Sequence, residues 1–136
     1  MAEAKLFFDD VNEGDEAPVV SHQLTRTDLV MYAGASGDFN PMHHDEVKAK
    51  EAGLPSVFGH GMFSMGLLGR AITDYVGIGN LRSYSVRFVK QTWPGETLRT
   101  KIVVRDVADG VATLDCTLEN ADGEAKVAGE ATAVVA

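Results

Sequence analysis

The chain has 136 residues, of which 45% are hydrophobic and 24% are charged, a composition typical of globular proteins. Its 20 acidic side chains outnumber the 12 basic ones, and the net charge of −8 opposes binding to nucleic-acid phosphates. No apolar run reaches the roughly 18 residues that a membrane-spanning helix needs. We therefore expect one domain over residues 1–136, with neither a nucleic-acid nor a membrane partner. Met1–Asp10 lacks the basic and apolar regions of a signal peptide, which predicts a cytoplasmic location.

The first predicted element is a helix. Thr25 and Asp28 have the spacing of a capping box, in which a hydroxyl at the helix start and a carboxylate three residues later each bond to the other residue's amide. A helix is therefore expected from Thr25 to about Ala35, ending at Gly37. Pro41 excludes a helix just before it, because a residue that precedes proline is disfavoured in the helical region. The residues between Gly37 and Pro41 are expected to be irregular.

Two more helices are expected next. The first is short and runs from His44 or Asp45 to Ala52, before a glycine and a proline that end it. The second covers Gly59–Val76, where the sequence is apolar on nearly every side of a helix and polar interruptions are few. Such a helix is predicted to be buried.

In the second half of the chain the apolar positions recur at every second residue, which is typical of β-strands. Strands are expected at about 84–88, 98–104, 114–118 and 127–135, with turns at 94–95, 109–110 and 122–123. Turns of this kind join neighbouring strands, so we expect an antiparallel meander. A sheet with one apolar face and an apolar helix predict an α+β fold in which the sheet wraps around the helix.

The irregular segment holds a cluster of groups that can transfer protons. Asp38 and His43 are five residues apart, and a turn at Pro41 can bring them together. A carboxylate and an imidazole that face one small volume can share a water molecule, which suits addition or loss of water across a polarised double bond. The plainer alternative is that these residues only form a turn and flank a helix start. A metal site is not expected, because the adjacent His43 and His44 project apart and no second cysteine is present.

The start of the long helix can bind a carbonyl oxygen. The backbone amides in the first turn of a helix have no partner inside the helix, and glycine at position 61 leaves room for a carbonyl group to approach. Gly61 is thus a candidate for holding the negative charge that develops on that oxygen. His60 can instead serve as a helix cap. The apolar side chains behind Gly61 can line an acyl chain as well as form the core.

Two motifs resemble one known family. The residues SGDFNPMH at 36–43 and FGHGM at 58–62 are similar to those of the (R)-specific enoyl-CoA hydratases, also called MaoC-like dehydratases. The resemblance covers most of the chain, from Gly14 to the turn at Pro94. It implies a MaoC-like hot-dog domain over residues 1–136, in which an antiparallel β-sheet wraps around a long central apolar helix, and it implies a dimer of such units.

The resemblance also implies roles for individual residues. Asp38 and His43 would hold the catalytic water, and the Gly61 backbone N–H would polarise a thioester carbonyl. Three residues would support this site: Ser36, Asn40 and His60. Five residues would bind the substrate's acyl chain or its phosphates: Met62, Phe63, Met65, Arg87 and Lys90. No metal or redox cofactor is implied, since coenzyme A or phosphopantetheine belongs to the substrate.

The function implied is reversible hydration of trans-2-enoyl thioesters of coenzyme A or acyl carrier protein to (3R)-3-hydroxyacyl thioesters in fatty acid metabolism. Two alternatives stay open. One is a hot-dog acyl-CoA thioesterase, in which a carboxylate directs water to the carbonyl carbon. The other is a non-catalytic acyl-binding partner subunit. The expected assembly is a homodimer or a higher homo-oligomer, although a heterodimer with a related subunit also fits the family.

Overall fold

The computed structural model describes residues 11–135, in which a short first strand is followed by the helices and then by four longer strands. The elements are β1 (Ser21–Gln23), α2 (Arg26–Ser36), the 3-10 helix η1 (Pro41–His43), α3 (Glu46–Glu51), α4 (Gly61–Val76), β2 (Leu81–Phe88), β3 (Thr97–Ala108), β4 (Val111–Asn120) and β5 (Ala125–Val134). The segment Met1–Asp10, on which the expectation about a signal peptide rests, lies outside the described residues. None of the helices described has the length and apolar character needed to cross a membrane.

The predicted capping box at the start of α2 is confirmed. The Thr25 hydroxyl accepts a hydrogen bond from the Asp28 amide at 3.1 Å, and the Asp28 carboxylate accepts one from the Thr25 amide at 2.9 Å. The helix ends at Ser36, where Gly37 adopts a left-handed conformation with φ of 78° that favours glycine. The short helix α3 also begins as predicted, because the Asp45 side chain accepts two amide hydrogen bonds there.

The five strands form one antiparallel sheet in the order β1-β3-β4-β5-β2. β3, β4 and β5 are joined as the predicted meander. The expectation that the turn at Pro94-Gly95 joins neighbouring strands was wrong, because β2 pairs with β5 and the connection after it crosses to β3. This pairing depends on Gly129, since a Cβ there would overlap the Ser85 carbonyl of β2. Residues 89–96, here called the crossing segment, connect β2 to β3, and part of this segment lines the cavity described below.

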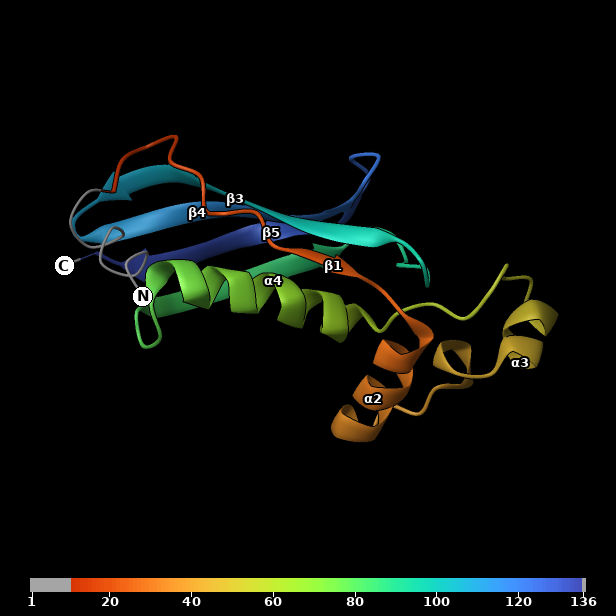
Figure 1. Cartoon of the computed structure of the whole chain (residues 1–136). Helices are drawn as coiled ribbons and strands as arrows, with labels where there is room; N and C mark the ends of the chain where they lie inside the picture. Colours follow the sequence, from red (N-terminus) through yellow and green to blue (C-terminus); the bar gives the residue numbers. More distant parts are fainter. Residues whose placement is uncertain (1–10, 136) are drawn as a thin grey trace.

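The long helix α4 lies along one face of the sheet (Figure 1). Its side toward the sheet carries the buried residues Ser64, Leu68, Ala71, Ile72 and Val76. Positions four residues apart on the opposite side are exposed: Met62, Gly66, Arg70 and Asp74. The prediction of a buried helix is therefore correct for the side of α4 that faces the sheet. The outer side of α4 is exposed in this chain.

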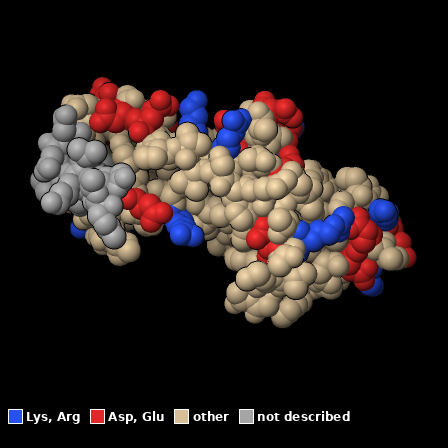
Figure 2. Space-filling model, in the orientation of Figure 1, with Lys and Arg blue, Asp and Glu red and all other residues tan. Residues whose placement is uncertain are grey.

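The helices α2 and α3 lie beyond the N-terminal end of α4 (Figure 1). Arg26 at the start of α2 joins them, because its guanidinium forms an ion pair with Glu46 of α3 and donates to the Ser56 hydroxyl. Charged side chains lie at both ends of the molecule and along its upper edge, whereas the surface below the middle of that edge is largely uncharged (Figure 2). The irregular segment after α2 is thereby held beside the first turn of α4.

Candidate active site

The segment that carries Asp38 is fixed by its own polar side chains. The Ser36 hydroxyl accepts a hydrogen bond from the Asp38 amide at 3.1 Å, and the Asp38 carboxylate accepts one from the Asn40 amide at 3.2 Å. The Asn40 side chain in turn accepts one from the Met42 amide at 3.1 Å. Each of these three residues therefore bends the chain two residues ahead, which is the turn-forming role open to Ser, Asp and Asn. Pro41 begins η1 directly afterwards.

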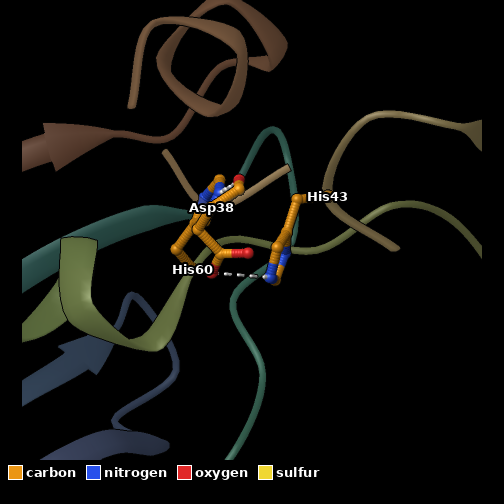
Figure 3. A group of neighbouring side chains, drawn as sticks. All are labelled: Asp38, His43 and His60. Atoms are coloured by element: carbon orange, nitrogen blue, oxygen red, sulfur yellow. Dashed lines mark hydrogen bonds and ion pairs between the residues drawn. The ribbon is translucent and has the colours of Figure 1, made fainter. Parts of the chain in front are cut away.

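His43 is buried, with 6% of its surface exposed, and its ring faces Asp38 (Figure 3). Its Nδ1–H donates a hydrogen bond of 2.7 Å to the Phe58 carbonyl. In the neutral ring the lone pair is therefore on Nε2, which lies 3.9 Å from Oδ2 of Asp38. This distance is too long for a direct hydrogen bond, and it allows one water molecule to contact both atoms. The carboxylate is half exposed, so it is accessible from solution.

His60 lies against His43 and helps to hold Asp38. The two imidazole rings are stacked with centroids 3.9 Å apart, and His60 Nε2–H donates to the Asp38 carbonyl oxygen at 3.1 Å. Burial lowers the pKa of His60, so the ring is neutral and its second nitrogen, Nδ1, carries a lone pair. No described residue donates a hydrogen bond to that nitrogen. His60 thus positions the backbone of Asp38.

The first turn of α4 has open amides, meaning backbone N–H groups to which no described residue offers an acceptor. His60 precedes the helix without giving a side-chain cap, and among the described residues no acceptor is found for the amides of Gly61 and Met62. The space beside the Gly61 Cα is filled by the Phe88 ring, 3.1 Å from the position that a Cβ would take. Packing against this ring, rather than room for a ligand, explains glycine at position 61. The amide of Gly61 still carries the positive end of the helix dipole.

A cavity of about 420 Å³ lies beside these groups. It is lined by His43, by Gly61 and Ser64 of α4, and by a wall made of residues 88–92 together with Lys126 of β5. The volume is within the range of small-molecule sites. His43 and the first turn of α4 therefore meet a ligand-sized cavity at one end of the central helix, and Asp38 lies beside His43 without lining that cavity.

The model of the MaoC-like domain family matches residues 11–125 of this sequence. The chain belongs to this family. 3-Hydroxyacyl-thioester dehydratase Y of Mycobacterium tuberculosis is 38% identical over 108 residues, which are 76% of this chain and 37% of that protein. A probable enoyl-CoA hydratase 2 of Dictyostelium discoideum is 34% identical over 93 residues, 65% of this chain and 32% of that protein. The chain spans about a third of the length of these relatives.

Solved structures share the fold over nearly the whole chain. An unliganded R-hydratase from Pseudomonas aeruginosa superimposes with a TM-score of 0.86 at 24% identity, covering 96% of this chain and 85% of that one. An (R)-hydratase from A. caviae gives a TM-score of 0.85 at 22% identity, covering 94% and 99%. The hot-dog fold expected from the sequence is confirmed.

The three apolar residues proposed to line an acyl chain do not line the cavity of this MaoC-like domain. Met62 is on the outer side of α4 and is 57% exposed. Phe63 packs against the Tyr32 ring at a centroid distance of 5.4 Å. Met65 is partly buried, and its carbonyl accepts a hydrogen bond from Tyr84 at 2.8 Å. The role of these three residues in substrate binding stays a prediction.

The two proposed phosphate ligands are in different places. Lys90 lines the cavity, where its ammonium group lies 3.1 Å from Glu124. Arg87 instead borders a separate depression with Arg105 and Glu130, on strands β2, β3 and β5. Arg87 points to the face of the sheet opposite to its neighbour Phe88, which lines the cavity, whereas Lys90 follows the end of β2. Only Lys90 of this pair therefore lies beside the cavity.

Sequence reasoning missed Lys126, a lysine with only 1% of its surface exposed. Its ammonium group donates to the Gln91 carbonyl at 2.9 Å and to the Glu124 carboxylate at 2.8 Å, and it lies 3.1 Å from Glu96. Its own carbonyl accepts the Val89 amide at 2.9 Å. One residue thus ties the crossing segment to β5. The sequence carries no signal for this, because a lysine in a strand is ordinarily exposed.

The described residues include one group of side chains that can hold a metal ion: Asp38, His43 and His60, whose ligand atoms lie within 4.8 Å of one another. One ring nitrogen of each histidine already donates to a backbone carbonyl. The other nitrogen is available either for a metal or for a proton. The expectation that the site works without a metal stays a prediction.

Proposed function

We propose that the chain catalyses the reversible hydration of trans-2-enoyl thioesters to (3R)-3-hydroxyacyl thioesters. The observation that carries the proposal is the 3.9 Å separation of Asp38 Oδ2 and His43 Nε2 beside the open first turn of α4. Membership of the MaoC-like family and the names of the two curated relatives support the same reaction class. The thioester belongs to coenzyme A or to the phosphopantetheine of a carrier protein.

In the forward direction His43 acts first as a base. Its Nε2 lone pair takes one proton from a water molecule that also donates a hydrogen bond to the Asp38 carboxylate. The water oxygen bonds to the β-carbon of the substrate, and the electron pair of the double bond moves toward the thioester oxygen. The His43 imidazolium then returns its proton to the α-carbon. One water molecule is consumed, and the enzyme ends in its starting protonation state.

The remaining residues serve these proton transfers. The Gly61 amide stabilises the negative charge on the thioester oxygen. The Phe58 carbonyl holds the His43 ring with Nε2 toward Asp38, and Asp38 stabilises the imidazolium as it forms. Asn40 and Ser36 keep the Asp38 backbone in its turn. No metal or redox cofactor takes part in these steps.

We infer that the chain acts as a homodimer or a larger homo-oligomer, in the cytoplasm. Support for association comes from apolar side chains that this chain leaves exposed: Val30, Met31, Met62, Phe88 and Val89. A heterodimer with a related subunit is the alternative. Light scattering on the purified chain measures the mass of the particle, and cell fractionation tests the location.

The decisive experiment offers trans-2-enoyl-CoA substrates of about four to about sixteen carbons to the purified chain. Hydration removes the conjugated absorbance, and chiral analysis of the product identifies the 3R isomer. Release of free coenzyme A without loss of the double bond would instead indicate a thioesterase. Binding with no change in absorbance would indicate a non-catalytic acyl-binding subunit.

A further inference from the structure

Ser64 lines the cavity, although the mechanism above gives it no role. It is 1% exposed and shares the cavity with His43 and Gly61. Its hydroxyl oxygen is buried, and no residue in the described range 11–135 forms a hydrogen bond with it. A buried hydroxyl without a partner lowers stability, so its presence needs an explanation.

The usual partner of a helical serine is not free to accept this hydroxyl. A serine inside a helix commonly donates to the carbonyl four residues earlier, which for Ser64 is that of His60. The His60 carbonyl already accepts the amides of Phe63 at 3.1 Å and of Ser64 itself at 3.3 Å. The Ser64 hydroxyl is therefore left for a group outside the helix.

The position of Ser64 directs its hydroxyl toward the open amides. It is the fourth residue of α4, three residues after Gly61. Side chains of a helix tilt toward its N-terminus, so the Ser64 side chain lies over the first turn. The hydroxyl and the Gly61 amide are thus two donors at the same end of the helix, on two residues that line the same cavity.

We propose that the Ser64 hydroxyl donates a second hydrogen bond to the carbonyl oxygen of the bound thioester, beside the Gly61 amide. This inference rests on the proposed function. Negative charge grows on that oxygen as water adds to the β-carbon, and two neutral donors stabilise it better than one. The hydroxyl keeps its proton throughout, and Ser64 is therefore a catalytic residue by contact with the substrate.

Thr92 provides an internal comparison. It is 3% exposed, lines the same cavity, and its hydroxyl oxygen also has no partner among the described residues. Thr92 lies against Gly59, before the helix begins, whereas Ser64 lies on the first turn itself. Because Ser64 is on the first turn, we assign the contact with the thioester carbonyl to Ser64. Thr92→Val is then the comparison variant for Ser64→Ala.

The test compares kcat/KM for a trans-2-enoyl-CoA in wild type, Ser64→Ala, Ser64→Cys and Thr92→Val. We expect Ser64→Ala to lose about 10²-fold in kcat/KM, as when one donor to an oxyanion is removed. Its Tm should not fall, because no hydrogen bond to the described residues is lost and alanine favours a helix. Ser64→Cys, a weaker donor of similar size, should lose less. Thr73→Ala on the same helix, outside the cavity, should match wild type.

A second measurement reports the hydrogen bond directly. A dienoyl thioester of coenzyme A absorbs at longer wavelength when its carbonyl oxygen is polarised. Bound to His43→Gln, which should consume it more slowly by on the order of 10² or more, this ligand should show a red shift that Ser64→Ala reduces in the same background. Unchanged kcat/KM in Ser64→Ala would overturn the proposal. So would a loss with an unchanged red shift, or a larger loss in Thr92→Val. A wild-type chain that hydrates no thioester would instead overturn the proposed function.

Discussion

The two walls of the cavity hold different kinds of buried polar group. On the wall formed by β5 and the crossing segment, the Lys126 ammonium group has three acceptors. At the start of α4, two buried polar atoms, Nδ1 of His60 and Oγ of Ser64, have no partner among the described residues. A buried charge without partners costs far more free energy than a buried hydroxyl does. The buried charge of Lys126 is therefore fully paired, whereas uncharged groups without a partner among the described residues occur on both walls, Thr92 on one and Ser64 on the other.

The largest effect is expected where protons are transferred. Asp38→Asn and His43→Gln should each reduce kcat for enoyl-thioester hydration by on the order of 10² or more, because each removes a group that contacts the water. The fold should survive, as the circular dichroism spectrum will show. His44→Gln is the matched control, since His44 is exposed and its ring, among the described residues, bonds to the Phe39 carbonyl alone. Normal turnover in both site variants would contradict the mechanism.

Substitution of Lys126, on the wall formed by β5 and the crossing segment, should lower the stability of the fold. Lys126→Met removes the charge shared by Glu96 and Glu124 and leaves the Gln91 carbonyl without its donor. Because both carboxylates are partly exposed, we expect a loss of about 2 kcal/mol in the free energy of unfolding, measured with urea. The exposed Lys101→Met variant should differ from wild type by less than about 0.5 kcal/mol. Equal midpoints for the two variants would mean that Lys126 does not anchor this wall.

A smaller effect of pH is expected at the start of α4. Burial lowers the pKa of His60 below its ordinary value of 6.5, so the unfolded chain binds a proton more readily than the folded one. This contribution to stability is present above pH 6.5 and is lost as the pH falls from 6.5 toward the lowered value. His60→Gln should lose less Tm than wild type does between about pH 7 and about pH 5. Parallel curves for the two proteins would refute this.

The smallest effect is expected from chelation. Asp38, His43 and His60 are able to hold a metal, but the proposed mechanism needs the same lone pairs for protons. Dialysis against EDTA should leave hydration activity unchanged, and metal analysis of the active protein should find no stoichiometric ion. Added Zn²⁺ should inhibit, since it competes with the proton for the histidine nitrogens. Activity that disappears with EDTA and returns with a metal would reverse this interpretation.

The local features of the fold could be predicted because they depend on neighbours in the chain. The capping box of Thr25 and Asp28 and the turn before Pro41 need only a few adjacent residues. The strand pairing was harder, since the place of β2 beside β5 depends on Gly129, more than forty residues away. In the site, Asp38 and His43 were identified from one motif, whereas nothing in the sequence marks Lys126 as buried.

The sequence alone determined which groups are present and how the chain turns around Pro41, because proline geometry and side-chain caps act over a few bonds. The tertiary structure decided which of those groups share a cavity. It left the Ser64 hydroxyl without a partner among residues 11–135, packed Phe88 against Gly61 and enclosed Lys126 among its acceptors. These outcomes depend on distances between elements remote in the chain, and only the packed sheet and helix set those distances.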